Sequence, residues 1–139
     1  MATKIRAEIS ERNPYWLEKH RYYELKHFCL QYPFWKHIYS SLDGLNGQTM
    51  QLAKSVSQSI MNDPTAKTGI VRAYYSERIE MLEDVAEQTD YQLSNYILQA
   101  VTEGWSYDIL KARLDIPCCK DVYYKLYRRF FWLLSKRRQ

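Results

Sequence analysis

The sequence predicts an all-α protein. Apolar residues recur at intervals of three and four along most of the chain, which is the period of an amphipathic helix. No stretch alternates convincingly between apolar and polar residues, and Asn46-Gly47 lacks the apolar flanks of a β-hairpin. Only 4 Gly and 4 Pro occur in 139 residues, so long helices joined by few loops fit the composition.

The first helices are expected after a polar and loose N-terminus over residues 1–12. Asn13-Pro14 predicts a cap followed by proline at the first helical position. Pro33 then interrupts this helix and predicts a second, short one over 33–39. The apolar stripe expected on the first helix comprises Trp16, Leu17, His20, Tyr23, His27, Phe28 and Leu30 or Gln31.

The middle of the chain predicts a linker and three further helices. Residues 43–48, DGLNGQ, hold two of the four glycines and form the linker. A helix over 50–61 follows, and Asn62-Asp63-Pro64-Thr65 stops or bends it. Thr89-Asp90 predicts the cap of a helix from Tyr91 to Gly104, a typical stop. The long helix before it has an expected stripe of Ile70, Ala73, Tyr74, Ile79, Leu82, Val85 and Ala86.

The C-terminal region predicts two helices joined by a short turn. Ser106 is a suitable N-cap for a helix over 107–114, and the residue before Pro117 avoids helical backbone. Ile116 anchors the turn, and the second helix begins after Cys118 or Cys119. The side chains expected to face the core are Ile109, Leu110 and Leu114 on the first helix, and Val122, Leu126, Phe130 and Leu133 or Leu134 on the second.

The charges are divided unevenly along the chain. Residues 111–139 contain nine basic against two acidic residues, a net charge of +7, whereas residues 1–110 contain 11 basic against 14 acidic, a net charge of −3. A positive charge concentrated at one end indicates a local surface for an anion. Packed aromatic residues beside a solvated basic face are the alternative interpretation of the same pattern.

Two helices with such a turn have the outline of a helix-turn-helix, in which the start of the second helix enters the major groove of DNA. Basic groups further along would hold phosphates and release counterions. The candidate DNA-binding residues are Ser106, Lys111, Cys118, Cys119, Lys120, Asp121, Tyr124, Lys125, Arg128, Arg129, Lys136, Arg137 and Arg138.

The stretch from Trp105 to Arg138 resembles the C-terminal segment of phage and prophage transcriptional regulators of the RinA and ArpU type. The matching pieces are Ser106-Tyr107, the Ile116-Pro117-Cys118 turn, Tyr123-Tyr124 and the block from Arg128 to Leu134, and residues 20–36 are similar to the N-terminal part of such proteins. The resemblance implies a sigma-factor-like DNA-binding region and an activator of phage late genes. The family often has a small polar residue where Cys118 and Cys119 stand.

Other chemistry is less favoured by the sequence. Adjacent cysteines on a helix diverge by about 100°, and His20 and His27 lie two turns apart, so we expect no metal site. Lys120 and the helix start could lower the thiol pKa of Cys118 or Cys119. No phosphate loop, zinc helix or nucleophile elbow appears, so we expect neither an enzyme nor a cofactor. No apolar run reaches the ~18 residues of a membrane span, and no secretory signal is recognisable. The 3 Cys are a poor disulfide framework, which favours a reducing cytoplasm. The resemblance to phage regulators implies that this is the cytoplasm of a bacterial host cell.

The sequence therefore predicts a flexible segment over 1–12, a helical partner-binding or oligomerisation region over 13–103, and a DNA-binding region over 104–139. The expected partner is double-stranded promoter or operator DNA, with host RNA polymerase and a second copy of the chain as further candidates. Two alternatives stay open. One is a small terminase subunit that binds a packaging site, and the other is a helical protein-interaction module without DNA binding.

Overall fold

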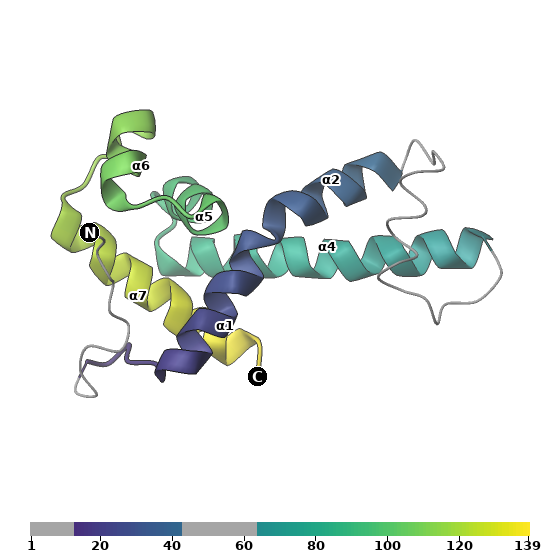
Figure 1. Ribbon diagram of the computed structural model, residues 1–139, viewed down its shortest axis with the longest axis horizontal. Coiled ribbons are helices and arrows are strands. Elements are labelled where there is room, and N and C mark those ends of the chain that lie inside the picture. The colour runs from purple at the N-terminus through teal and green to yellow at the C-terminus, as the bar shows by residue number, and fades with distance from the viewer. Residues whose placement is uncertain (1–12, 43–63) are drawn as a thin grey trace. The chain divides into compact units, whose positions relative to one another are not determined.

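The computed structural model describes residues 13–42 and 64–139, with the side chains of 13–42 and 69–139 (Figure 1). None of these residues forms a strand, so the predicted all-α class is confirmed. The helices are α1 (Lys19–Leu30), α2 (Tyr32–Leu42), α4 (Pro64–Thr89), α5 (Ser94–Glu103), α6 (Tyr107–Leu114) and α7 (Lys120–Arg137). The predictions for residues 1–12, for the linker over 43–48 and for the helix over 50–61 lie outside the described residues.

Helix α1 begins later than the sequence predicts. Asn13 closes a turn instead of capping a helix: its carbonyl accepts from Trp16 N at 3.0 Å and its Oδ1 from Tyr15 N at 2.8 Å. Glu18 is the actual N-cap, because its carboxylate accepts from the backbone N–H groups of His20 and Arg21. The hydrogen bond from the His20 backbone stabilises the carboxylate and lowers the pKa of Glu18.

The buried face of α1 also differs from the predicted stripe. His20, Tyr23 and His27 are exposed. Two of the predicted residues are buried, Phe28 within α1 and Leu17 just before it. A helix face is set by what packs against it, and several stripes of this helix have the required spacing. The residues of α1 that are buried are Tyr22, Leu25, Phe28 and Cys29.

The chain divides into two compact units, and the boundary falls within α4. One unit runs from Tyr32 to Glu80, and the other joins the chain up to Gln31 with Met81–Gln139. Helices α5, α6 and α7 share the second unit with α1, so the functional boundary at residue 104 stays a prediction.

The unit Tyr32–Glu80 contains α2 and the first part of α4. The ring of Phe34 meets that of Tyr75 edge-on with centroids 6.4 Å apart, and the Arg72 guanidinium lies 5.8 Å from the Tyr39 ring. Helix α2 begins one residue before the predicted Pro33. Its buried residues are Trp35, Ile38 and Leu42.

Along α4 the buried stripe is shifted by one residue in its first half. Ile70 is 50% exposed and Tyr74 is half-buried, whereas Val71 and Tyr75 are buried. The prediction is wrong for Ile70, Ala73 and Tyr74 and confirmed for the later positions. Between residues 69 and 89, the buried residues of α4 are Val71, Tyr75, Ile79, Leu82, Val85, Ala86 and Thr89.

In the larger unit, α1 packs against α5 and α7, and α6 packs against α5 and α7. Asp90 opens the turn into α5, since its Oδ1 accepts from the N–H groups of Gln92 and Leu93 at 3.0 Å. Thr89 does not cap, because it is the last residue of α4 and its hydroxyl donates to Val85 O. Gly104 ends α5 with a φ of 75°, as predicted, a conformation that glycine adopts without a Cβ penalty.

Tyrosines fill the contact between α1 and α7. The hydroxyls of Tyr22 and Tyr127 lie 2.7 Å apart, and the Tyr22 ring meets Phe131 edge-on at 5.3 Å. The hydroxyl of Tyr123 is also buried but has no hydrogen-bond partner among the described residues. Burial raises the pKa of both Tyr123 and Tyr127, so both rings are neutral in this core.

No helix within residues 13–42 and 64–139 is long and apolar enough to cross a membrane.

We expect the two buried tyrosines of α7 to respond in opposite ways to loss of the hydroxyl. Tyr127→Phe removes the hydrogen bond to Tyr22 and should lower the free energy of unfolding by about 1 kcal/mol. Tyr123→Phe removes a buried hydroxyl without a described partner and should leave stability unchanged or raise it. Urea unfolding measures both, and a larger loss for Tyr123→Phe than for Tyr127→Phe would contradict this description of the core.

Candidate nucleic-acid interface

Helices α6 and α7 and the connection between them have the outline that the sequence predicts. The Ser106 hydroxyl accepts from Ile109 N at 3.3 Å and caps α6, and Asp115 ends that helix with a φ of 52°. Ile116 is fully buried and Cys119 is the N-cap of α7, so the predicted anchor and helix start are both confirmed. That the pair serves as a DNA-binding motif stays a prediction.

Two tyrosines and a lysine tie the start of α7 to α6. The Tyr107 hydroxyl donates to Cys118 O at 2.7 Å, and Tyr107 N donates to the hydroxyl of Tyr124 at 3.1 Å. Lys111 Nζ donates to Ile116 O at 3.1 Å and pairs with Asp115 at 2.9 Å. Tyr124, one of the candidate DNA-binding residues, is therefore half-buried in this contact.

The buried face of α7 is rotated by one residue from the predicted one. Val122 is 46% exposed and Leu126 is half-buried, so neither is the core residue that the sequence predicts. On α6 the same correction applies to Ile109 and Leu114, which are exposed, while Leu110 is buried. The residues of α7 that are buried are Tyr123, Tyr127, Phe130, Phe131 and Leu134.

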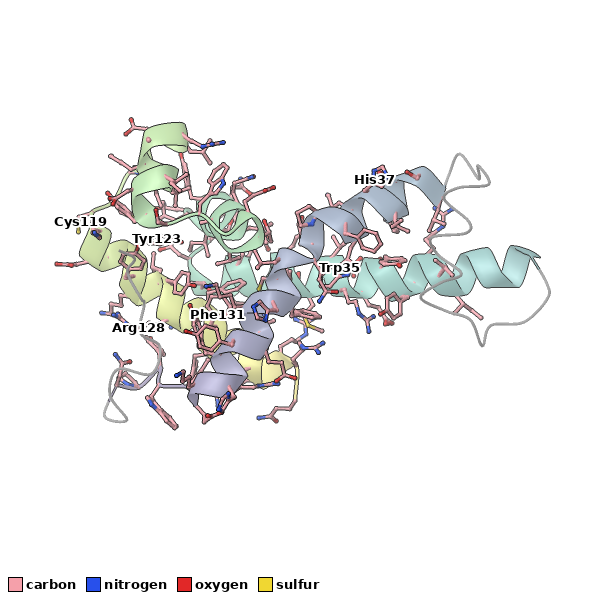
Figure 2. The ribbon with its side chains drawn as sticks, in the orientation of Figure 1. Trp35, His37, Cys119, Tyr123, Arg128 and Phe131 are labelled. Atoms are coloured by element: carbon pink, nitrogen blue, oxygen red, sulfur yellow. The ribbon has the colours of Figure 1, made fainter. Side chains whose placement is uncertain are left out.

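This rotation sets the outward face of α7. Residues 121, 125, 129, 132 and 136 follow one another at intervals of three and four on the side opposite the buried rings, and residue 128 lies on the same side. Figure 2 shows Cys119 at the end of α7 that follows the connection, with Tyr123, Arg128 and Phe131 further along the helix. On this outward face, the side chains of the first two turns are exposed, whereas those of the later turns contact other residues of the same unit.

Around the start of α7 the charged side chains are exposed. The side chains of Lys120, Asp121 and Lys125 make no hydrogen bond or ion pair with the part of the chain that the structure describes. Cys119 is exposed and makes no side-chain capping bond, and Cys118 is half-buried. Burial, followed by the neighbouring Cys119, raises the pKa of the Cys118 thiol, so the expected lowering is wrong for this residue.

In the middle of α7 both arginines make hydrogen bonds within the same unit. Arg129 donates to Gln88 O at 3.2 Å and to the Tyr15 hydroxyl at 3.3 Å, and the Tyr15 ring lies 5.5 Å from that of Trp132. Arg128 is half-buried and its Nη1 lies 3.4 Å from Tyr124 O. The segment before α1 thus covers the outward face of α7 at Arg129.

The terminal basic cluster is also engaged within the unit. Arg137 lies 3.5 Å from Asp84, the Arg138 guanidinium stacks 3.8 Å from the centroid of Phe28, and Lys136 lies 4.5 Å from that of Trp132. At about 1.5 Å per residue, Arg137 is about 26 Å along α7 from Lys120. The structure therefore does not bring the two groups of basic residues together.

Sequence reasoning missed two residues that shape this region. Arg21 of α1 donates to the carbonyls of Ser135 and Arg138 at 3.1 Å and so satisfies the C-terminal end of α7. Arg113 is exposed on α6, with its guanidinium 5.0 Å from the Trp105 ring. No local signal identifies this role of Arg21, because its partners on α7 lie more than a hundred residues away. Arg113 was recognisable as a cation near the predicted turn.

The described residues contain no group of three or more histidine, cysteine, aspartate or glutamate side chains placed to hold a metal ion. Cys29 is fully buried in the core, and burial raises the pKa of its thiol well above the ordinary value of 9.0. The thiol is accordingly protonated and behaves as a small packed group.

We expect Arg129→Ala to act mainly on stability. It removes the hydrogen bonds to Gln88 and Tyr15. A hydrogen bond from a charged donor contributes about 1.5 to 3 kcal/mol when it is sheltered from water. Because these bonds are partly exposed, we expect a loss near the lower limit. Thermal unfolding followed by circular dichroism measures the change. Lys125→Ala, which removes an exposed cation of the same helix, is the control and should leave the unfolding midpoint unchanged.

Known proteins offer no match: no family model fits the chain, and neither a curated protein nor a solved structure corresponds to it.

Proposed function

We propose that the protein is a sequence-specific DNA-binding transcriptional activator that places the start of α7 in the major groove. The observation that carries this proposal is the pair α6–α7, in which Tyr107 holds both Cys118 and Tyr124 while the outward side chains of the first two turns of α7 are exposed. In helix-turn-helix proteins this end of the second helix contacts base edges. The resemblance to RinA- and ArpU-type regulators supports the activator role and late phage genes as its targets.

The structure changes which basic residues we assign to DNA. Lys120 and Lys125 are exposed at the start of α7, and Arg113 is exposed on α6, so these three are the cations best placed for phosphates and bases. Arg129, Arg137 and Arg138 have partners inside the unit, and we assign them to folding. Ser106 and Lys111 act indirectly in this proposal, because they hold α6 and its turn.

The partners expected beyond DNA remain part of the proposal. A second copy of the chain would double the contacts to a symmetric operator, and RNA polymerase is the partner that an activator requires. A packaging-site protein of the small terminase class would use the same module in a ring. Mass in solution separates a dimer from a ring.

A helical protein-interaction module is the second candidate. It is favoured by the internal contacts of Lys111, Arg129, Arg137 and Arg138, which reduce the positive charge available to DNA. Selection of bound fragments from the source genome decides between the two. Enrichment of discrete sites, with an affinity that falls steeply with salt, is expected for a DNA-binding activator; recovery of no enriched fragment would contradict it.

We expect Lys120→Ala to weaken binding to all duplexes to a similar degree and to reduce the salt slope by about one unit, because one phosphate contact is lost. Lys136→Ala is the matched control, since it removes an exposed lysine at the other end of the same helix, beside Trp132. Fluorescence anisotropy at several salt concentrations measures both. An equal effect of the two substitutions would show that DNA does not approach the start of α7 preferentially.

A further inference from the structure

Val122 is an exposed apolar residue whose position the fold does not explain. It is the third residue of α7 and is 46% exposed, while the adjacent Tyr123 is fully buried. A β-branched side chain is less favourable than alanine in a helix, so Val122 does not serve helix formation. Isolated apolar residues do occur on protein surfaces, and its surroundings are what distinguish this one.

The surroundings of Val122 form a small apolar spot between charges. Cys119 precedes it by three residues and therefore lies beside it on the helix, and both side chains are exposed. Asp121 and Lys125 flank the spot, one carboxylate and one ammonium. Because Cβ atoms of a helix tilt toward its N-terminus, the methyl groups of Val122 are directed toward the end of α7 that carries Cys119.

The orientation of this spot is fixed by α6. Tyr107 donates hydrogen bonds to residues on either side of Val122 in the sequence: its hydroxyl to Cys118 O, and its backbone N–H to the Tyr124 hydroxyl. The buried rings of Tyr123 and Tyr127 prevent the helix from turning Val122 inward. A ligand that approaches the start of α7 therefore meets Val122 in a defined position.

The chemistry of the spot matches one feature of the major groove. Thymine alone presents a methyl group there, at the C5 position, and small apolar side chains recognise it by contact. The neighbouring Asp121 would repel a phosphate, so this part of α7 suits base edges better than the backbone. We infer that Val122, beside Cys119, contacts the methyl group of a thymine in the recognised DNA.

This inference rests on the proposed function, and its test removes only the methyl group. The complete chain is titrated against a duplex selected from the source genome, and against duplexes in which each thymine in turn is replaced by deoxyuridine. At one position the wild-type protein should bind the deoxyuridine duplex about 4-fold more weakly, the effect of one buried methyl group. Val122→Ala should bind the thymine duplex more weakly and should no longer distinguish the two duplexes.

Ile109→Ala is the matched control, because Ile109 is similarly exposed, at 41%, but lies on α6. This variant should keep the sensitivity to the methyl group. Circular dichroism checks that both variants fold, which their exposed positions predict.

The outcomes separate the inference from the function on which it rests. Two outcomes overturn the inference and leave DNA binding intact. In the first, the wild-type protein binds specifically but no thymine methyl group affects its affinity. In the second, the effect of the methyl group persists in full in Val122→Ala. If the chain binds no selected duplex at all, the proposed function and this inference both fail.

Discussion

The aromatic face of α7 packs against α1, and this contact determines which side chains of the helix remain outside. Tyr22 of α1 meets both Tyr127, through their hydroxyls, and Phe131, through an edge-on ring contact. Aromatic pairs of this kind add about 0.5 to 1.5 kcal/mol beyond the burial of their area. Since Tyr123, Phe130 and Leu134 point to the same interior, α7 cannot rotate without exposing several rings. Asp121, Val122 and Lys125 face outward as a consequence.

The same contact gives the two ends of α7 different roles. Near its C-terminus, Arg21 of α1 satisfies the last carbonyls and Arg138 stacks on Phe28, so basic residues there hold the helix in place. The side chains of Arg137 and Asp84 are both exposed to solvent, so the ion pair between them adds little stability by itself. At its N-terminus α7 is held through its backbone and Tyr124, which leaves neighbouring side chains available to a ligand.

Local signals in the sequence were sufficient to predict the elements around this site. Ser106 caps α6, Gly104 ends α5 and Ile116 anchors the connection, because capping and turn chemistry depend on residues close in sequence. The rotation of α1, the first half of α4 and α7 could not be predicted in this way. Two stripes on α7 have helical spacing, Val122–Leu126–Phe130 and Tyr123–Tyr127–Phe130. The second stripe is buried because Tyr127 forms a hydrogen bond with Tyr22, which lies more than a hundred residues away in sequence. The contacts of Arg129 could not be predicted locally either, since its partners Gln88 and Tyr15 are distant in sequence.

The central claim is that DNA binds at the exposed side chains near the start of α7 and not at the basic C-terminal end of that helix. Backbone amide chemical shifts of the complete chain, followed by NMR during titration with a selected duplex, test it most directly. The account predicts the largest changes at residues 118–126 and small changes at residues 134–138. The largest changes at residues 134–138, with the start of α7 unaffected, would contradict it.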